Sequence, residues 1–351
     1  MPWAVCWDEL QGRVPPLEQR QEPSRSSCLK PLAALRRGLL AQWPLVARRP
    51  AANEDLGSYQ LGSQQAHQWL RRLLPRPIAS TLLQRQEEKL FCEKLGGEVY
   101  TFAEEENLHL QLLRPPNSDS KPGCMVLLHG GSWISGSPSQ FYEHAQAVAK
   151  DLGVSVATCQ YRLMLTHPRA DVPFDAVEDA ERCVHFLHDQ ADELGLDRRR
   201  LVLGGLSAGG HLAAMAALER GTELGLAGLV LLNPVLDLDF RAGWRRQTPS
   251  IWLGAHLLRA VYGEEALHAK SPLHQVRSLP FPTLILHGEE DTLIPLAQSE
   301  AFMKEMRRSN NECMVVPFPQ VDHDFLRVPP ELAERHVSTL GEFFRSAGVL
   351  A

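Results

Sequence analysis

Ser207 lies in a pattern that can turn a serine hydroxyl into a nucleophile. It is the central residue of Gly-Leu-Ser-Ala-Gly, between an apolar run typical of a buried strand and an Ala/Leu/Met run typical of a helix. Such a strand–turn–helix crowds the backbone around the serine, and the glycines remove Cβ atoms that would clash. The start of a helix also favours negative charge. The pattern predicts a nucleophile, although the same five residues also occur in plain glycine turns.

A serine hydroxyl is a weak nucleophile unless a base takes its proton and a third group orients that base. Two later loops supply these groups, since Asp291 follows the apolar residues 283–286 and His323 follows residues 314–318. The order serine, acid, histidine is the one expected when such a turn carries the nucleophile. We therefore predict Ser207 as the nucleophile, His323 as the base and Asp291 as the acid.

Other acids and histidines remain candidates from the sequence. Glu290 neighbours the predicted acid, and Asp237 follows an earlier predicted strand, so either carboxylate is an alternative. His287 ends a predicted strand and is expected to pack beneath the site. His211 lies one helical turn after the serine and is expected to face away from its hydroxyl, in a structural role.

The segment His-Gly-Gly-Ser-Trp follows a further apolar run. Acyl transfer builds an oxyanion, whose charge is stabilised by N–H groups held in fixed positions. A loop at this place, together with the residue after the nucleophile, can supply them. We predict N–H donors at Gly131, Ser132 and Ala208. Gly130 is a further candidate donor, and the ring of Trp133 is expected beside the acyl group, while a plain glycine turn is the structural alternative.

These residues need a scaffold that brings distant loops together. Apolar runs typical of strands alternate with stretches typical of helices. The predicted strands are 98–102, 108–113, 124–128, 154–158, 201–203, 226–232, 282–287 and 313–318. The predicted helices are 139–151, 173–194, 295–308 and 330–345, beside the one after the serine. This alternation predicts that residues 98–351 form an α/β domain, with a largely parallel sheet covered by helices on both faces.

Three other stretches lie outside this alternation. Residues 1–28 are rich in Pro, Gln, Glu, Arg and Ser and are expected to be disordered. Residues 29–97 carry leucines at helical spacing, interrupted by prolines such as Pro75 and Pro77, and are predicted to be an appendage of short helices that is a candidate cap over the site. Residues 237–278 show no strand pattern and are predicted to be an insertion near the site.

The composition limits the expected partners. A net charge of −6 gives no reason to expect nucleic acid or an anionic membrane. The seven cysteines are scattered without a C-x-x-C pair, so neither a disulfide framework nor a zinc site is expected. Cys124, Cys159 and Cys183 fall in apolar segments and are predicted to be buried. No apolar run suits a membrane span and the first residues do not form a signal peptide, so the expected location is the cytoplasm.

The motifs carry a family resemblance over residues 98–349. The segments HGGSW, GLSAGGHLAA, NPVLD, SPLHQV, LILHGEEDTLIP and VDHDF resemble those of the hormone-sensitive-lipase and acetyl-esterase branch of the α/β-hydrolases, especially its bacterial esterase/lipase-type members. Two departures stand out. The first loop has HGGS where the branch often has HGGG, and Asp322 and Asp324 flank the histidine where glycine is usual. HGG-x-W is also similar to the motif of kynurenine formamidases.

The resemblance implies an α/β-hydrolase fold and a serine esterase that acts on a small-molecule ester, with no cofactor and no metal. The large ring of Trp133 and the polar, arginine-bearing residues 237–278 favour short acyl groups, acetyl among them. Two alternatives stay open. One is an arylformamidase or another small amidase, because of HGG-x-W, and the other is a catalytically inactive hydrolase fold used for binding.

Overall fold

The computed structural model of the protein describes residues 76–116, 121–167, 170–239, 258–259, 262–327 and 330–350. The disorder predicted for residues 1–28 lies outside this part of the chain. So does most of the appendage predicted for residues 29–97, and so does part of the insertion predicted for residues 237–278. The described residues of that insertion contain no strand, as expected, and residues 262–269 are helical.

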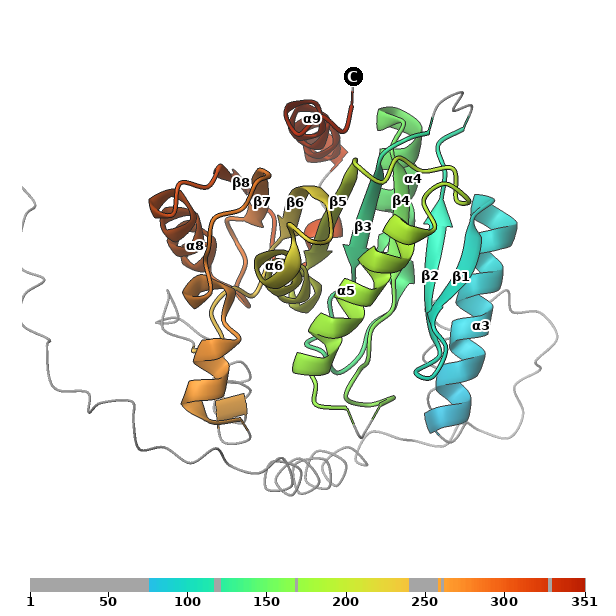
Figure 1. Ribbon diagram of the computed structural model, residues 1–351, viewed down its shortest axis with the longest axis horizontal. Coiled ribbons are helices and arrows are strands. Elements are labelled where there is room, and N and C mark those ends of the chain that lie inside the picture. Colours follow the sequence, from blue (N-terminus) through green and yellow to red (C-terminus); the bar gives the residue numbers. More distant parts are fainter. Residues whose placement is uncertain are drawn as a thin grey trace, which may run out of the picture. The chain divides into compact units, whose positions relative to one another are not determined.

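The described residues form one sheet of eight strands in the order β1-β2-β4-β3-β5-β6-β7-β8 (Figure 1). The strands are β1 (Glu98–Ala103), β2 (Leu108–Leu113), β3 (Cys124–Leu128), β4 (Ser155–Cys159), β5 (Leu201–Leu206), β6 (Leu226–Leu232), β7 (Thr283–Gly288) and β8 (Cys313–Phe318). β1 and β2 form an antiparallel hairpin, and β2 pairs antiparallel with β4. Every pairing from β4 to β8 is parallel, so the predicted, largely parallel α/β sheet is confirmed.

The central strands are buried on both faces, which explains their continuous apolar runs. All residues of β3, β4 and β5 are buried. Because successive side chains point to opposite faces, Val126 and Leu128 join one core cluster while Met125 and Leu127 join the other. The fold therefore has two hydrophobic cores, one on each side of the sheet.

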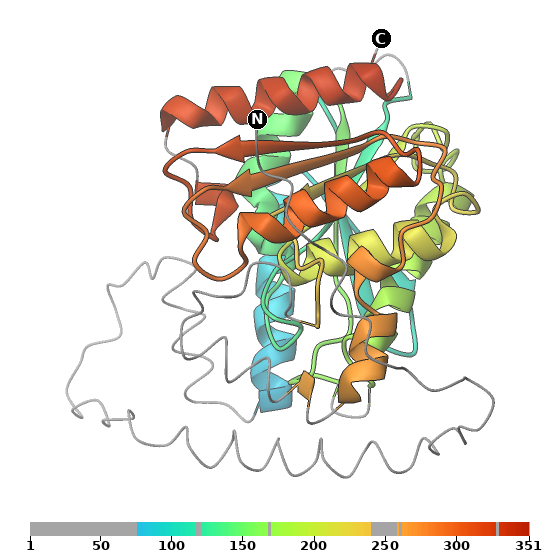
Figure 2. The same cartoon turned by 90° about the vertical axis from the view of Figure 1, so that its left-hand side faces the viewer.

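Helices cover both faces (Figures 1 and 2). The helices are α3 (Arg76–Leu95), α4 (Tyr142–Leu152), α5 (Phe174–Asp189), α6 (Ala208–Arg220), α8 (Leu296–Arg308) and α9 (Pro330–Ser346), with short 3-10 turns η3 (Pro138–Phe141), η5 (Pro272–His274) and η6 (Phe325–Arg327). Side chains of α5, α6 and α8 fill the cluster that contains Val126. Side chains of α4 and α9 fill the cluster that contains Met125. Both faces are therefore covered, as predicted.

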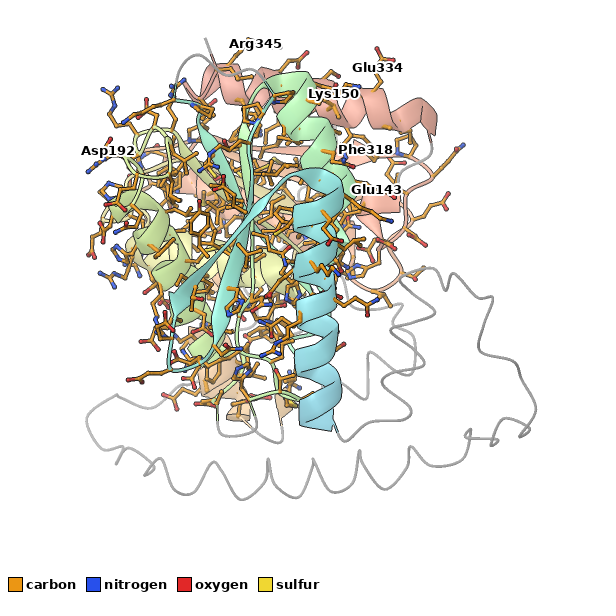
Figure 3. The ribbon with its side chains drawn as sticks, turned by 90° about the vertical axis from the view of Figure 1, so that its right-hand side faces the viewer. Glu143, Lys150, Asp192, Phe318, Glu334 and Arg345 are labelled. Carbon is orange, nitrogen blue, oxygen red and sulfur yellow. A yellow bond between two sulfur atoms is a disulfide. The ribbon has the colours of Figure 1, made fainter. Side chains whose placement is uncertain are left out.

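The helix α3 is longer than the sequence suggested. The prolines near its start were expected to split this region into short helices, but residues 76–95 form one helix. Pro77 lies in the first turn, where a backbone N–H has no helical partner, so its missing donor costs little. The helix contacts β1 and β2 (Figure 3). Phe91 is fully buried there with its ring 5.2 Å from that of Tyr142.

One disulfide departs from the sequence prediction. Cys159, at the end of β4, is bonded to Cys183 of α5, whereas no disulfide framework was expected. Both cysteines are buried, as predicted, because α5 packs on the face to which the end of β4 points. Cys124 is a buried free thiol. The pairing depends on the crossover that folds α5 back onto the sheet, and the spacing of 24 residues along the chain does not reveal it.

The outer sides of the helices are polar. Glu143 and Lys150 of α4 and Glu334 and Arg345 of α9 are exposed (Figure 3). Among the described residues, no helix has the length and apolar character needed to cross a bilayer. The cytoplasmic location stays a prediction from the sequence.

Histidines enclosed in the core make the fold sensitive to acid. Burial lowers the pKa of His129 and of His211 to about 4, and it lowers that of His336 well below its usual value. The unfolded chain binds a proton at each of these sites near pH 6.5, whereas the folded chain does not. The free energy of unfolding must therefore fall as the pH drops from about 6.5 towards about 4. At pH 5, His129 and His211 should each lower the free energy of unfolding by about 2 kcal/mol relative to its value at pH 8.

We expect this loss to appear in urea unfolding curves recorded at pH 8, 6 and 5. The ring of His336 packs against Phe318 and Phe325, and its Nε2 atom has no hydrogen-bond partner among the described residues. His336→Phe should therefore be tolerated at pH 8 and should reduce the slope of stability against pH by about 1.4 kcal/mol per pH unit below pH 6. The part-exposed His188, replaced by Gln, is the control. An unchanged slope in His336→Phe would contradict the expectation.

Candidate active site

Ser207 occupies the predicted turn between β5 and α6. Its backbone has φ 55° and ψ −114°, a strained conformation that projects the side chain from the turn. Glycine is required on both sides, because a Cβ at Gly205 would lie 2.4 Å from the backbone of Gly209, and one at Gly209 would lie 2.0 Å from the carbonyl oxygen of Leu128. The N–H of Ser207 donates to Leu232 O of β6 at 2.9 Å. The turn is therefore fixed to both neighbouring strands.

The loops after β7 and β8 bring the predicted acid and base to this serine. His323 Nε2 lies 2.8 Å from Ser207 Oγ, and His323 Nδ1 lies 2.8 Å from Asp291 Oδ2. A carboxylate only accepts, so the Nδ1–H donates to Asp291 and the bare Nε2 accepts from the serine hydroxyl. The imidazole is thus held in the tautomer that can take the serine proton. All three residues predicted from the sequence meet in one hydrogen-bonded chain.

Asp291 is held rigidly. Its side chain is fully buried, and its Oδ1 atom accepts the N–H groups of Leu293 and Ile294, each at 2.8 Å. These two bonds leave Oδ2 directed at His323. Fixing the carboxylate fixes the ring that bonds to it, which is the role expected of the third member of such a set.

The rival residues lie elsewhere. His287 is buried beneath Asp291, with Nδ1 2.8 Å from Ser299 Oγ and Nε2 3.0 Å from Ile294 O, and burial lowers its pKa. His211 Nε2 lies 2.8 Å from the carbonyl oxygen of Lys270. Both rings have the structural placement that the sequence suggested. Glu290 is exposed.

Asp237, the other alternative acid, is buried on the loop after β6, 3.9 Å from His274 Nε2. His323 Nδ1 instead donates its hydrogen bond to Asp291 Oδ2. The geometry therefore favours Asp291 as the acid.

The His-Gly-Gly-Ser-Trp loop follows β3 and has an unusual backbone. Gly131, Ser132 and Trp133 all have positive φ, at 125°, 54° and 56°. The N–H of Gly130 donates to Gln140 Oε1 at 2.7 Å, so this candidate donor is already engaged. The hydrogen bonds among the described residues do not use the N–H groups of Gly131, Ser132 or Ala208. The set of candidate oxyanion donors therefore narrows to these three.

The His-Gly-Gly-Ser-Trp loop is held in place by two side chains that were not predicted from the sequence. Gln140 of η3 accepts from the loop through the Gly130 N–H. The hydroxyl of Tyr161 donates to His129 O at 2.8 Å, and the two rings stack with centroids 4.3 Å apart. The sequence assigned a role to neither residue, and only the fold brings both to the loop. A glutamine shortly after a glycine loop is too common to be a signal.

Trp133 lies close to the site but within the core. Its side chain is 7% exposed, and its ring meets the edge of His211 of α6 with centroids 5.3 Å apart. The carbonyl oxygen of Trp133 accepts from Met164 N at 3.0 Å. The ring therefore forms a wall between the loop and the helix that carries the serine.

Asn233 is a third residue that sequence reasoning missed. It follows β6 with φ 40° and is fully buried. Its Nδ2 donates to the carbonyl oxygens of Asp322 and His323, at 2.8 and 3.0 Å, and its Oδ1 accepts from Gly288 N at 2.8 Å. One amide thus joins the acid-bearing and base-bearing loops. An asparagine directly after a buried strand can mark a position with positive φ, but it does not reveal these distant partners.

The site can therefore supply a nucleophile, a base in the correct tautomer, an orienting acid and three N–H groups for an oxyanion. A match to the BD-FAE family covers residues 110–306, more than half of the chain. The chain belongs to the BD-FAE family. This match contains the His-Gly-Gly-Ser-Trp loop, Ser207 and Asp291, while His323 follows it. Family and topology agree on an α/β-hydrolase fold.

Individual relatives of this BD-FAE chain are named as esterases. Ethyl acetate hydrolase of Pseudomonas putida is 31% identical over 235 residues, which cover 63% of this chain and 72% of that protein. Esterase LipC of Mycobacterium tuberculosis is 26% identical over 62% of this chain and 56% of its own length. The butyrate-bound structure of the Thermogutta terrifontis esterase Est2 has a TM-score of 0.61 and 30% identity, over 74% of this chain and 97% of that one.

Proposed function

We propose that Ser207, His323 and Asp291 hydrolyse carboxylic esters through an acyl-enzyme. The protein is a carboxylic-ester hydrolase, as its BD-FAE membership and its esterase relatives support. The roles of the individual residues are our proposal. The observation that carries it is the unbroken pair of 2.8 Å hydrogen bonds from Ser207 Oγ through the His323 ring to Asp291.

In the first half of the reaction, Ser207 Oγ attacks the ester carbonyl carbon while His323 Nε2 takes the hydroxyl proton. The carbonyl oxygen becomes an oxyanion, which the N–H groups of Gly131, Ser132 and Ala208 stabilise. The imidazolium that forms is stabilised by the buried Asp291 carboxylate. Its Nε2 proton then passes to the alkoxy oxygen, the C–O bond breaks and the alcohol leaves.

The second half repeats these steps with water. His323 Nε2 takes a proton from a water molecule, whose oxygen attacks the acyl carbon and forms a second oxyanion on the same N–H groups. When the oxyanion collapses, the proton returns to Ser207 Oγ and the carboxylic acid leaves. The enzyme is regenerated with no net change in its own protons.

The proposed substrates are esters with short acyl groups. Trp133 fills space beside the loop that holds the candidate oxyanion donors, which leaves less room for an alkyl chain. The similar proteins point the same way, because one is named ethyl acetate hydrolase and the esterase Est2 has been solved with propionate and with butyrate bound. Acetyl to butyryl esters are therefore the substrate class that we propose.

Turnover of p-nitrophenyl esters of increasing chain length tests this proposal. We expect kcat/KM to be highest for acetate to butyrate and to fall for octanoate. Trp133→Ala should enlarge the acyl side and raise the octanoate-to-acetate ratio by about tenfold or more, since a methylene in an apolar pocket is worth about 1–3 kcal/mol. Trp133→Leu, which fills part of the volume, should give an intermediate ratio.

Because both variants open space in the core, their unfolding curves must be measured beside the kinetics. Wild-type preference for octanoate, or activation at an oil–water interface, would contradict the short-chain proposal and favour a lipase. Faster hydrolysis of N-formylkynurenine than of p-nitrophenyl acetate would favour the formamidase alternative.

We also propose that residues 29–97 shape the edge of the site. The supporting contacts come from α3, where Glu88 Oε1 lies 2.7 Å from His109 Nδ1 and Gln84 Nε2 lies 3.4 Å from Gln160 Oε1. Gln160 directly precedes Tyr161, whose hydroxyl donates to His129 O in the His-Gly-Gly-Ser-Trp loop. Deleting residues 1–92 and repeating the ester series tests this role, and an unchanged chain-length preference would contradict it.

A further inference from the structure

A group of side chains with metal-ligand chemistry lies outside the proposed catalytic set. Asp239 is on the loop after β6, and His268 and His274 come from the chain just before η5 and within it. His268 Nδ1 lies 2.9 Å from Asp239 Oδ2, and His274 Nε2 lies 3.3 Å from the same oxygen. The three ligand atoms all lie within 4.8 Å of one another. Two imidazoles and a carboxylate are ligands that Zn²⁺ and similar divalent ions accept.

These separations suit a tetrahedral ion. Bonds of about 2.0–2.1 Å at tetrahedral angles put neighbouring ligand atoms about 3.3 Å apart. Asp237 Oδ1 lies 3.9 Å from His274 Nε2 but does not belong to the group of three ligand atoms that lie within 4.8 Å of one another. The side chain of Asp237 must therefore move towards the ion to become a fourth ligand.

Charge and burial also favour a cation at this place. The side chain of Asp237 is fully buried and that of Asp239 is 3% exposed. They are held near each other, because the N–H of Asp239 donates to Asp237 Oδ1 at 2.9 Å. A divalent ion bound beside these two carboxylates would be attracted by both of them. The histidine side chains are 54% and 26% exposed, so the group is accessible from solvent.

Ser271 gives the group a firm support. Its buried hydroxyl donates to Leu267 O at 2.8 Å and accepts from Leu238 N at 2.8 Å. These partners are the residues directly before His268 and Asp239. Hydrogen bonds of this kind, one step beyond the ligands, fix the positions from which ligands reach an ion.

The two imidazoles must turn to bind an ion. In the structure they stack, with centroids 4.0 Å apart and planes at 16°. An imidazole nitrogen binds an ion that lies in the plane of its ring, and two nearly parallel planes cannot share such a point. Rotation of the part-exposed rings of His268 and His274 removes this conflict. An imidazole nitrogen that binds an ion must present a lone pair, so the proton of each neutral ring must lie on the other nitrogen, and protons compete with the ion at low pH.

We propose that Asp239, His268 and His274, completed by Asp237, form a binding site for a divalent transition-metal ion of the Zn²⁺ class. The proposed hydrolysis uses none of these four residues. An ion bound there joins the chain on the two sides of residues 240–257, which begin directly after Asp239. Its role is therefore to stabilise that junction.

Zinc binding to the full-length protein tests the proposal without any activity measurement. The protein is freed of metal with a chelator and titrated with Zn²⁺ against a chromophoric competitor at pH 7.5 and 5.5. We expect one saturable equivalent at pH 7.5 and much weaker binding at pH 5.5. Co²⁺ in place of Zn²⁺ should give the intense visible absorption bands of a tetrahedral site.

His268→Gln and His274→Gln test the ligands while sparing the fold, because glutamine can still donate to Asp239 but has no imidazole lone pair. Each change should weaken binding of the equivalent by about 10–100-fold, and the double change should abolish it. His188→Gln is the matched control, since His188 Nδ1 also lies near one carboxylate, 3.4 Å from Asp189, but without a second histidine. It should bind Zn²⁺ as the wild type does.

Three results would overturn the proposal. They are a wild-type protein that takes up no saturable equivalent at pH 7.5, a double glutamine variant that binds Zn²⁺ as tightly as the wild type, and a Co²⁺ spectrum that is the same in both. Thermal unfolding of the metal-free variants, compared with that of the metal-free wild type, shows whether the variants are folded. Variants that unfold like the metal-free wild type and still bind Zn²⁺ place the equivalent elsewhere.

Discussion

Ser207→Ala should remove nearly all ester hydrolysis, and His323→Ala should do the same. Without Oγ no acyl-enzyme forms, and without the imidazole the base that lies 2.8 Å from Oγ is lost. We expect each change to lower kcat by about 10⁴–10⁶-fold. The KM for p-nitrophenyl acetate should change much less, because the walls of the site stay in place.

The double variant should be little worse than either single one. A nucleophile and its base act as a unit, so once one of them is lost, loss of the other lowers kcat only slightly further. The residual rate of all three variants should come from the N–H groups that hold the oxyanion, which neither substitution touches. If the fold-losses in kcat of Ser207→Ala and His323→Ala multiplied in the double variant, the two side chains would act separately.

A fluorophosphonate probe provides an independent control. It should label the wild type at Ser207 and leave Ser207→Ala unlabelled, whereas Ser338→Ala, which changes an exposed serine of α9, should label and turn over normally. Absence of labelling in the wild type would favour an inactive binding protein. Turnover near the wild-type rate in His323→Ala would make His287 the candidate base.

Parts of the site whose signal is local in the chain could be predicted from the sequence. The turn at Ser207 is specified by five consecutive residues. A Cβ atom at Gly205 would clash within the turn, and one at Gly209 would clash with the end of β3. Asp291 and His323 could be predicted because each lies in the loop that follows an apolar strand. Parallel pairing of β5 through β8 then brings the three strand ends to one edge of the sheet.

The residues that hold the loops could not be predicted in this way. Asn233 binds backbone atoms that are 55, 89 and 90 residues away in the chain, and no local pattern records such partners. Gln140 is close to Gly130 in sequence, but its side chain reaches back only because η3 turns the chain. This contact also decides which N–H groups stay available, so the set of oxyanion donors needed the structure.

Local patterns were also misleading in places. The proline at position 77 was expected to end a helix, but position within a helix decides its effect, and the first turn tolerates it. The bond between Cys159 and Cys183 was missed because both lie in apolar segments, where buried thiols are the usual expectation. In both cases the residue type alone does not determine the structure, because the position in the helix or the neighbours in space decide it.

Asp291→Asn should lower kcat by about 10⁴-fold while the fold is retained. The amide oxygen of asparagine can still accept from the N–H groups of Leu293 and Ile294, which now hold Oδ1. The amide NH₂ then faces His323 Nδ1, and two donors cannot bond. The ring must place its proton on Nε2, towards Ser207, and in that tautomer Nε2 has no lone pair with which to take the hydroxyl proton.

A second variant, Asp291→Ala, distinguishes an orienting role from a merely structural one. Asp291→Ala leaves Nδ1 without a partner and so allows both tautomers, and it should therefore retain at least as much activity as Asp291→Asn, despite the larger change in volume. Glu290→Gln, which neutralises the exposed neighbouring acid, should turn over p-nitrophenyl acetate at the wild-type rate. A mild loss in Asp291→Asn together with a large one in Asp237→Asn would move the acid to the loop after β6. The 2.8 Å bond from His323 Nδ1 to Asp291 Oδ2 is the reason to expect the opposite.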